Sequence, residues 1–405
     1  MLLRASPWLF ALLLSACAVR PPVEPSAPHP APTPAPVPPP PPVLTPTPAA
    51  AYPTLKPVDW AAFTFWQDNS VSEVWTAFLR GCTTLKKQSA WQAVCNEAAT
   101  MTQPDDATAR AFFVQRFQLY QATQDDGNAE GLITGYYEPL LKGDRVRTER
   151  ARFPLYAAPD DLITVDLASV YPELKNLRLR GRLVGNKLVP YPTRKEIEAA
   201  ANGNGFKGKP IAWVEDPVDL FFLQIQGSGR IELPDGSHLR VGYADQNGYP
   251  YQSIGKLLVE RGELKLDQAS MQGIKDWGVK NPDKLPDLLA SNPSFVFFRE
   301  LPNGLSGPLG SLGVPLTGGR SIAVDPRYIP LGAPVFLATT QPNSTLPLNK
   351  LVMAQDTGGA IRGGVRADVF WGFGDAAGEL AGRMKQRGKM WVLLPKDYPI
   401  ASARR

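Results

Sequence analysis

The sequence predicts a mainly β protein with some α-helix, in which helices at the N-terminus precede a barrel. Residues 70–125 carry apolar side chains at helical spacing, for example at Val74, Trp75, Phe78 and Phe112. From residue 130 to 345 the chain consists mostly of short β-branched, aromatic or alternating runs separated by Gly, Pro, Asn and Asp. Regularly spaced short strands with few helices between them favour a barrel over a doubly wound sheet.

Residues 1–16 resemble a lipoprotein signal peptide. A single charged side chain, Arg4, precedes the apolar run 8–14, which is too short to span a bilayer. The run ends in LSAC, which is similar to the lipobox of bacterial lipoproteins, so Cys17 is the predicted lipidation site. By the same resemblance, Ala18 indicates sorting to the outer membrane. An ordinary signal peptide with an incidental cysteine is the alternative.

Residues 17–54 are expected to be the lipidated cysteine and a proline-rich tether. The stretch 21–53 holds sixteen of the 42 prolines and is nearly free of charge, so it cannot build a core. As an extended polyproline II segment it would let a folded body reach about 100 Å from its anchor. A plain disordered tether would be more compact and serve the same end.

Cys82 and Cys95 remain of the three cysteines once Cys17 is assigned to lipid. Export implies an oxidising compartment, which favours a disulfide between them. The bond would close a short loop between two helical segments and contribute about 3 kcal/mol. Two buried free thiols are the alternative.

Histidine is almost absent from the chain, which narrows the chemistry. Of two histidines, His29 lies in the tether and His238 follows a predicted turn at 234–236. A Ser-His-Asp relay or a multi-histidine metal site is therefore not expected, and neither a metal nor a cofactor is predicted. Carboxylate acid–base chemistry remains. The net charge of +5 is spread along the chain without a long basic run, so nucleic acid is not an expected partner.

About 350 residues follow the tether, enough for two domains. Predicted strands include 132–137, 177–184 and 221–226, and helices are predicted at 252–276 and 375–387. In the strand 177–184 arginines alternate with leucines. These arginines are expected either to form a solvated strand face or to bind an anion.

Three aspartates in the last ninety residues are the candidate acids. Asp325 precedes Pro326 and Asp356 precedes a Thr-Gly-Gly sequence, so turn initiation is an alternative use for both, and the favoured one for Asp325. Asp368 differs because it enters the apolar strand Val-Phe-Trp. Partial burial there would raise its pKa, as a general acid requires. A salt bridge to Arg366 would have the opposite effect and is the alternative.

Two further segments have the composition of a sugar site. GYYEP at 135–139 and QIQGSG at 224–229 combine aromatic rings, amides and glycines. Aromatic faces pack on pyranose rings, and amides pair with hydroxyls as donor and acceptor. Core tyrosines and edge-strand glutamines are the alternative interpretation.

These motifs, in this order, resemble the MltA family of membrane-bound lytic murein transglycosylases of Gram-negative bacteria. The similarity covers roughly residues 55–395. Its last part, about 313–395, resembles the 3D module, named for three aspartates that are here Asp325, Asp356 and Asp368. The matching segments are GYYEP at 135–139, QIQGSGRI at 224–231, YADQNGYPYQSIGK at 243–256, NPSFVFFRE at 292–300, GVPLTGGRSIAVDPRYIPLG at 313–332 and AQDTGGAIRGGVRADVFWGFGDAAG at 354–378.

The resemblance implies a double-psi β-barrel domain formed by 55–164 and 294–405. A second β-barrel domain, expected at 165–293, would interrupt it, with a glycan groove between the two. The implied partners are peptidoglycan glycan strands and an outer-membrane lipid anchor facing the periplasm. A complex for cell-wall synthesis or hydrolysis is a further candidate partner.

The implied reaction cleaves the β-1,4 bond between N-acetylmuramic acid and N-acetylglucosamine and leaves a 1,6-anhydromuramic end. One carboxylate, Asp368, would act first as acid and then as base, whereas ordinary glycosidases use two. Asp356 and Asp325 would support it. The expected substrate-binding residues are Thr134, Tyr136, Glu138, Gln224, Gln226 and Ser228. A hydrolase that uses Asp356 and Asp368 as a pair, and a wall-binding lipoprotein without activity, are the alternatives.

Overall fold

The computed structural model describes residues 52–66, 70–174, 177–203 and 205–400. The predicted signal peptide, the lipidation site at Cys17 and nearly all of the tether lie outside the described residues. The described residues belong to the unit Pro48–Arg405, to which everything below refers. None of the helices within the described ranges is both long and apolar enough to cross a membrane.

Helices form the N-terminal layer, as predicted from apolar spacing. They are α1 (Trp75–Leu85), α2 (Ser89–Thr100) and α3 (Asp106–Arg116), after the short 3-10 turn Ser72–Val74. Asp105 caps α3 by accepting a hydrogen bond from the Thr108 amide at 2.8 Å. Cys82 of α1 and Cys95 of α2 are joined in a disulfide, with Cα atoms 5.3 Å apart. The helical prediction was wrong beyond residue 116, where Phe117 and Tyr120 lie in a strand whose aromatic residues suit a sheet equally well.

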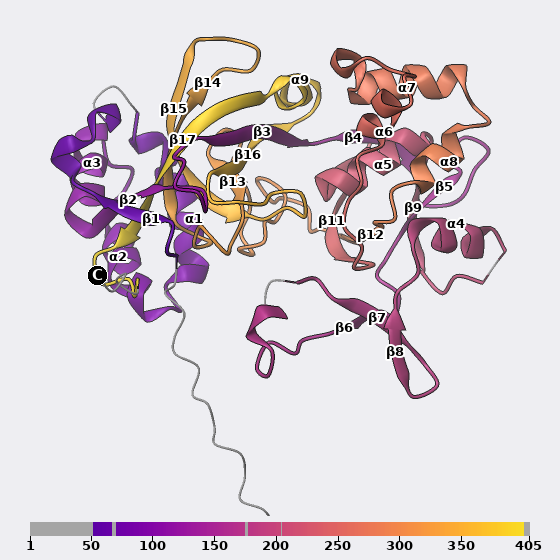
Figure 1. Ribbon diagram of the computed structural model, residues 1–405, viewed down its shortest axis with the longest axis horizontal. Helices are drawn as coiled ribbons and strands as arrows, with labels where there is room; N and C mark the ends of the chain where they lie inside the picture. The colour runs from indigo at the N-terminus through magenta and orange to yellow at the C-terminus, as the bar shows by residue number, and fades with distance from the viewer. Residues whose placement is uncertain (1–51, 67–69, 175–176, 204, 401–405) are drawn as a thin grey trace, which may run out of the picture. The chain divides into compact units, whose positions relative to one another are not determined.

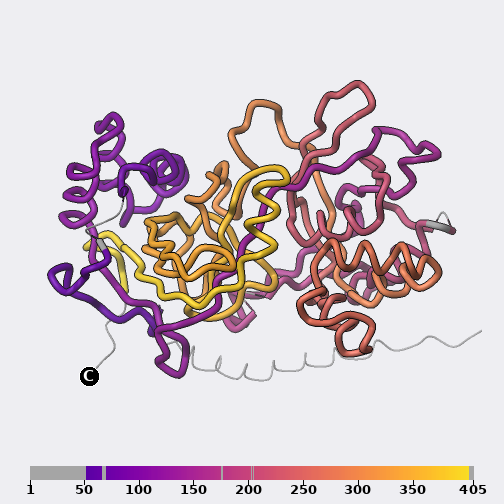
Figure 2. Tube along the Cα trace, turned by 90° about the horizontal axis from the view of Figure 1, so that it is seen from above, coloured from indigo at the N-terminus to yellow at the C-terminus, as the bar shows by residue number. Residues whose placement is uncertain are grey.

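The first sheet closes on itself. Its order is β1-β2-β17-β14-β15-β13-β16-β3, and β17 also pairs with β3, so the strands from β17 to β3 form a ring. Figures 1 and 2 show how β3, early in the chain, lies beside the C-terminal β16 and β17. Helix α9 (Asp375–Arg383) packs on β3 and β16. The strands are β1 (Leu55–Val58), β2 (Phe117–Ala122), β3 (Gly131–Glu138), β13 (Ser321–Val324), β14 (Pro334–Thr340), β15 (Pro347–Asp356), β16 (Arg366–Phe373) and β17 (Lys385–Pro395).

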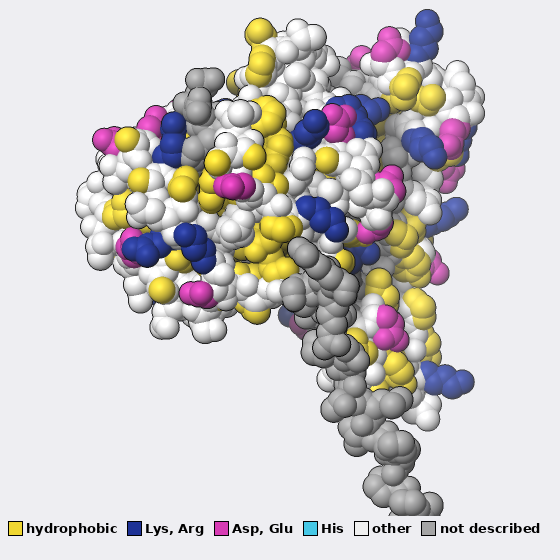
Figure 3. Space-filling model, turned by 60° about the vertical axis from the view of Figure 1, so that its left-hand side comes forward, with side chains coloured by type: hydrophobic (Ala, Val, Ile, Leu, Met, Phe, Trp, Pro, Cys, Tyr) yellow, Lys and Arg dark blue, Asp and Glu magenta, His cyan; other side chains and the backbone are white. Residues whose placement is uncertain are grey.

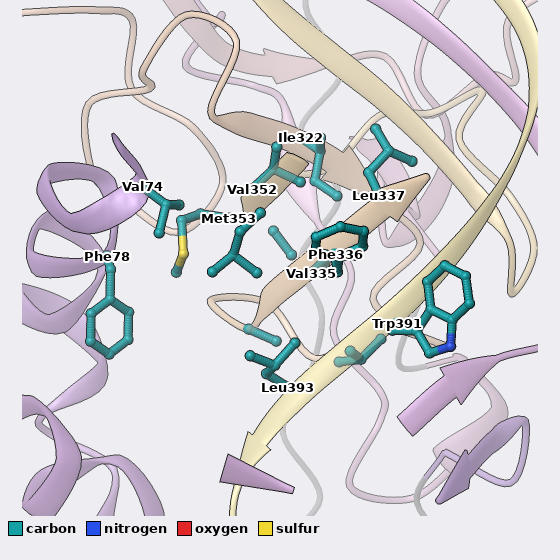
Figure 4. Packing of buried hydrophobic residues seen from close by; sticks show 14 of the residues in the cluster. Val74, Phe78, Ile322, Val335, Phe336, Leu337, Val352, Met353, Trp391 and Leu393 are labelled. Atoms are coloured by element: carbon teal, nitrogen blue, oxygen red, sulfur yellow. The ribbon is translucent and has the colours of Figure 1, made fainter. Parts of the chain in front are cut away.

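The main hydrophobic core joins this ring to the helical layer. Figure 4 shows Phe336 of β14, Met353 of β15 and Leu393 of β17 among its members, with Phe78 contributed by α1. All four side chains are fully buried. Consecutive residues of β14, Val335, Phe336 and Leu337, are all buried, so both faces of the ring are packed. Burying each such side chain contributes about 1.5–3 kcal/mol.

A second sheet has the order β12-β11-β10-β4-β9-β5. The chain enters it after Pro139, which separates β3 from β4, and leaves it at Glu300. This span is wider than the range 165–293 expected for the insert. The strands are β4 (Leu140–Asp144), β5 (Phe153–Tyr156), β9 (Pro210–Val214), β10 (Ser228–Glu232), β11 (His238–Gln246) and β12 (Val296–Glu300).

More helices accompany the second sheet than the sequence predicted. The structure confirms the helical stretch at 252–276, as α6 (Ile254–Glu260) and α7 (Met271–Lys280), and adds α4 (Arg194–Asn202) and α8 (Leu285–Ala290). The strand predicted at 221–226 was wrong, because these residues belong to α5 (Pro217–Gln226). Signals at its ends outweigh its β-favouring aromatic residues: Asp216 caps the Val218 and Asp219 amides, and Gly227 ends the helix with φ +79°.

A small third sheet contains β6 (Ile163–Thr164), β7 (Arg180–Val184) and β8 (Lys187–Pro190). The strand predicted at 177–184 is confirmed from Arg180 onward. On the face of the molecule shown in Figure 3, Lys and Arg side chains are interspersed with Asp and Glu and do not gather into one basic surface.

Candidate active site in the cleft between the first and second sheets

Residues of the first and second sheets line a common cleft of about 620 Å³. The first sheet contributes Tyr136 of β3, Asp356 of β15 and Asp368 of β16. The second sheet and its helix α5 contribute Gln224, Gln226, Ser228 and Tyr243. Sequence segments about 230 residues apart therefore meet in one site.

Asp368 is the third residue of β16 and is half-buried in the cleft wall. Its backbone pairs with Thr134 of β3 on one side and Ala323 of β13 on the other. The Thr134 hydroxyl donates a hydrogen bond of 2.5 Å to Asp368 Oδ1. Burial raises the pKa of Asp368 above its ordinary value, although Thr134 and Arg366 act in the opposite direction. The carboxyl group is therefore suited to hold a proton and deliver it to a bound ligand.

The alternative role for Asp368, a salt bridge to Arg366, is not present. The Arg366 guanidinium instead donates to the backbone oxygen of Ala367 at 2.6 Å and to that of Leu132 at 3.5 Å. Arg366 thus ties the start of β16 to β3 and leaves the second carboxylate oxygen of Asp368 without a hydrogen bond from the described residues.

Asp356 is the last residue of β15, and its carboxylate accepts more hydrogen bonds than that of Asp368. Its Oδ1 accepts hydrogen bonds from the backbone amide and hydroxyl of Ser311 at 2.9 and 3.0 Å and from the Thr357 amide at 2.9 Å. Its Oδ2 accepts from the Tyr136 hydroxyl at 2.8 Å. Burial raises its pKa in spite of these four bonds, which favour the charged form. Asp356 in turn raises the pKa of Asp368, because two nearby carboxylates disfavour a second negative charge.

Asp325 lies outside the cleft wall. Its side chain is fully buried and forms an ion pair with Arg327 at 2.6 Å, and it also accepts a hydrogen bond from the Gly363 amide at 3.0 Å. Burial by itself would raise its pKa, but the bonds from Arg327 and Gly363 outweigh that effect and lower it. Its backbone oxygen accepts from the Tyr328 and Ile329 amides, which confirms the turn interpretation of this residue.

Glu138 also lies away from the cleft wall, contrary to the glycan contact expected of it. Its side chain is only 1% exposed, and its two oxygens pair with Arg230 at 2.9 Å and Arg240 at 3.4 Å. Glu138 is the last residue of β3, where the chain passes into the second sheet. Its carboxylate therefore pairs with arginines of that sheet and stabilises it, instead of facing the cleft.

The amide segment lines the cleft. Gln224 and Gln226 are in the last turn of α5, and Ser228 opens β10. The Gln224 side-chain oxygen accepts a hydrogen bond from Arg194, and that of Gln226 accepts from the Tyr137 amide at 3.2 Å. Both amides are therefore fixed in orientation before any ligand arrives.

Four further residues line the cleft, and of these only Arg178 belongs to a pattern noted in the sequence, the alternating arginines for which anion binding was the alternative use. Tyr243 and Tyr251 are large aromatic side chains that stay 36% and 38% exposed, and Arg178 and Arg299 are cationic. Burial of the Tyr243 hydroxyl raises its pKa to about 12, so it stays a neutral hydrogen-bonding group. The tyrosines stand in the matched segment 243–256, but nothing in its spacing distinguishes an exposed ring from a core ring.

Within the described ranges no group of His, Cys, Asp and Glu side chains is arranged to hold a metal ion. The chemistry that the cleft offers is proton transfer by a carboxyl group with a raised pKa, beside aromatic rings and oriented amides. Aromatic rings and amides are the groups that proteins use for sugars, and carboxyl acids are what glycosidic oxygens need. Fold and site together define a β-rich glycan-cleaving class.

Comparison with known proteins identifies the family. Residues 132–299 match the MltA specific insert domain and residues 320–394 match the 3D domain. Membrane-bound lytic murein transglycosylase A of Escherichia coli (strain K12) is 33% identical over 296 residues, which cover 71% of this chain and 72% of that protein. The chain belongs to the MltA family, as the resemblance of its motifs predicted.

Solved structures of similar proteins support the same family. The crystal structure of MltA from Neisseria gonorrhoeae is 43% identical, covers 85% of this chain and 93% of its own, and superposes with a TM-score of 0.73. A crystal structure of Escherichia coli MltA with bound chitohexaose is 26% identical, with coverage of 84% and 94% and a TM-score of 0.63. That protein binds a glycan oligomer. These neighbours share the β-rich mixed fold of this chain.

Proposed function

We propose that this protein is a lytic transglycosylase that cleaves the β-1,4 bond between N-acetylmuramic acid and N-acetylglucosamine in peptidoglycan. The observation that carries the proposal is Asp368. It is a carboxyl group with a raised pKa in the wall of a cleft, held by Thr134 and not paired with a cation. Family membership and the lytic murein transglycosylase relatives support the same reaction.

In the proposed reaction, Asp368 begins protonated and gives its proton to the glycosidic oxygen as the bond to C1 breaks. Positive charge builds at C1. The resulting carboxylate then takes the proton from the muramoyl C6 hydroxyl, whose oxygen bonds to C1. Asp368 ends protonated, and the products are a free 4-hydroxyl and a 1,6-anhydromuramic end. No water is consumed, and neither a metal nor a cofactor takes part.

The remaining site residues divide by position. Thr134 would orient Asp368, and Asp356, held by Tyr136, would raise the pKa of Asp368 so that it holds its proton. The cleft-facing amides and hydroxyl of Gln224, Gln226 and Ser228 would bind sugar hydroxyls. Asp325 and Glu138 would act through the scaffold.

The ring of strands is proposed to be a double-psi β-barrel. Two parallel pairs inside a ring that is otherwise antiparallel, β3 with β16 and β13 with β15, support this topology. The second and third sheets with their helices would be the insert. It would extend beyond the expected range 165–293 to about residues 140 and 300, where the second sheet begins and ends.

The protein is further proposed to be anchored by a lipid on Cys17 in the outer membrane, facing the periplasm. The signal-like residues 1–16, and relatives named membrane-bound, support this location. The disulfide between Cys82 and Cys95 suits an oxidising compartment. A complex with other enzymes of cell-wall synthesis or hydrolysis would fit the same compartment.

Mass spectrometry of muropeptides tests the reaction. Purified sacculi are digested with residues 54–405, together with a matched digest by the Asp368→Asn variant. Products lighter by one water than hydrolysed ends are expected from the wild type. Reducing ends would instead indicate a hydrolase that pairs Asp356 with Asp368. No release by folded protein that still binds sacculi would indicate a wall-binding lipoprotein.

A further inference from the structure

Two guanidinium groups in the cleft are not neutralised by any carboxylate of the described residues. Arg178 and Arg299 both line the cleft, and neither forms an ion pair there. Arg194 also reaches the cleft, but it is buried and donates to the backbone oxygens of Asn292 and Ser294. A cation that stays unpaired in a concave site is available to an anionic ligand.

Arg178 is held in place by its neighbours in the chain. Arg180 forms a salt bridge of 2.8 Å with Asp245, and both side chains are less than 20% exposed. The backbone at Arg178 and Arg180 packs on the turn at Gly248, whose φ is +89°. A Cβ atom at Gly248 would lie 3.0 Å from Arg180 Cβ and 3.3 Å from the Arg178 oxygen, so glycine permits this close contact.

From this position Arg178 reaches the opposite wall of the cleft. One of its guanidinium nitrogens donates to the Thr357 hydroxyl at 3.3 Å. That hydroxyl shares a 2.7 Å hydrogen bond with Ser311, which in turn donates to Asp356. Two hydroxyl groups therefore link Arg178 to Asp356, which lies beside the proposed acid Asp368, and most of the five N–H donors of Arg178 are unused.

Arg299 approaches the cleft from the second sheet. It lies on β12 directly opposite Gly242 of β11, which lies opposite Ser228 of β10. Residues on one rung of a sheet share a face, so Arg299 is on the face where Ser228 lines the cleft. No described residue accepts a hydrogen bond from its side chain, and it is exposed.

We propose that Arg178 and Arg299 are specificity-determining residues that bind a carboxylate carried on the muramoyl lactyl group of the glycan. This inference rests on the proposed function. A guanidinium fork matches a carboxylate in geometry and charge, whereas a neutral chitin-type strand offers it only hydroxyls and amides. Two sources supply the same chemistry: the free lactyl carboxylate of a peptide-free strand, and the carboxylates of an attached stem peptide.

Calorimetric binding to three ligands tests the proposal, with the full chain carrying Asp368→Asn so that ligands remain intact. The ligands are neutral chitohexaose, peptide-free muramoyl glycan and peptide-bearing glycan. Arg178→Gln and Arg299→Gln are each expected to weaken binding of the acidic glycan about tenfold. Chitohexaose binding should not change. Arg182→Gln is the matched control, because Arg182 is exposed on β7, shortly after Arg178 in the chain, but does not line the cleft.

The pattern of loss decides between the two sources. A loss only for the peptide-free glycan assigns the lactyl carboxylate, because an attached stem peptide converts that carboxylate into an amide. A loss only for the peptide-bearing glycan assigns the stem peptide, and a loss for both shows that the two arginines accept a carboxylate from either source. Equal weakening for chitohexaose, or no change for any ligand, would overturn the proposal. Failure of the proposed function has a different signature, namely wild-type digests of sacculi that contain no anhydro ends.

Discussion

Aspartate side chains have opposite pKa shifts in two regions of the molecule, the cleft end of the ring of strands and the turn after β13. In the cleft, Asp356 and Asp368 have raised pKa values, because burial there outweighs the hydrogen bonds that they accept. In the turn, the side chain of Asp325 has no exposed surface, yet its pKa is lowered by Arg327 and the Gly363 amide.

The two regions differ in the partner that each carboxylate meets. A buried carboxylate with a cation and an amide becomes a fixed charge that stabilises the fold. A carboxyl group without a cation keeps an affinity for protons and becomes a reagent. The comparison therefore predicts that the cleft acids and the turn acid respond to the same Asp→Asn change with opposite balances of activity and stability.

The largest effect is expected for Asp368→Asn. Loss of the general acid should lower turnover about 10²–10⁴-fold in release of anhydromuropeptides. Stability at pH 7 should be unchanged or higher by thermal unfolding, since ionising a group whose folded pKa is raised costs stability as the pH rises through that pKa. Asp375→Asn is the control, because Asp375 is exposed at the start of α9. Turnover equal to wild type would contradict the mechanism.

Removal of the disulfide is expected to lower the unfolding free energy without changing the catalytic site. The double change Cys82→Ala and Cys95→Ala opens a loop with a sequence separation of 13 and should cost about 3 kcal/mol in denaturant unfolding. Neither cysteine lines the cleft, so turnover per folded molecule should persist below the unfolding transition. A loss of turnover in fully folded protein would show that the helical layer controls the cleft.

Asp325→Asn should reverse the pattern of Asp368→Asn. We expect a loss of about 2 kcal/mol in unfolding free energy at pH 7, because the charge-assisted bonds to Arg327 and Gly363 weaken. Turnover of the folded protein should be retained. In the wild type this contribution exists above the unfolded pKa and disappears as the pH falls through the lowered folded pKa. The difference between wild type and variant should therefore shrink below about pH 4.

Arg327→Gln provides the second half of that test. It removes the cation and leaves Asp325 in place, so the acid should lose most of its pKa depression and the variant should unfold at a similarly reduced free energy. A variant of either residue that lost turnover while remaining fully folded would break the distinction between the two regions.

The smallest effect is expected for Tyr136→Phe, which removes one of four hydrogen bonds to Asp356. The pKa of Asp356 should rise further, and stability should fall by about 1 kcal/mol. Turnover should fall no more than about tenfold. The pH dependence of turnover measures the effect of Tyr136→Phe on the titration of Asp368. In the wild type, activity should decline as the pH rises through the raised pKa of Asp368, and in the variant this decline should occur at a different pH. An unshifted profile would separate Asp356 from the titration of Asp368.

Local signals in the sequence were sufficient for part of this result. The apolar spacing in α1 and α3, the helical stretch at 252–276 and the strand at 132–137 were predicted because period and composition agree there. They disagreed at α5, where aromatic and β-branched residues indicated a strand but Asp216, Pro217 and Gly227 at the ends define a helix. The ordered motifs also identified the family, which no single motif could have done.

The sequence by itself determined which residue types were available: acids without histidines, in a glycine-rich frame, with amides and aromatic rings elsewhere. Only the tertiary structure decided which of them share a site. Glu138 looked like a ligand-binding acid until Arg230 and Arg240, about a hundred residues later, were found to pair with it. Arg178 looked like part of a strand face until its segment was found packed beside the cleft. A pKa or a contact depends on neighbours within a few ångströms, and folding brings those neighbours from distant parts of the chain.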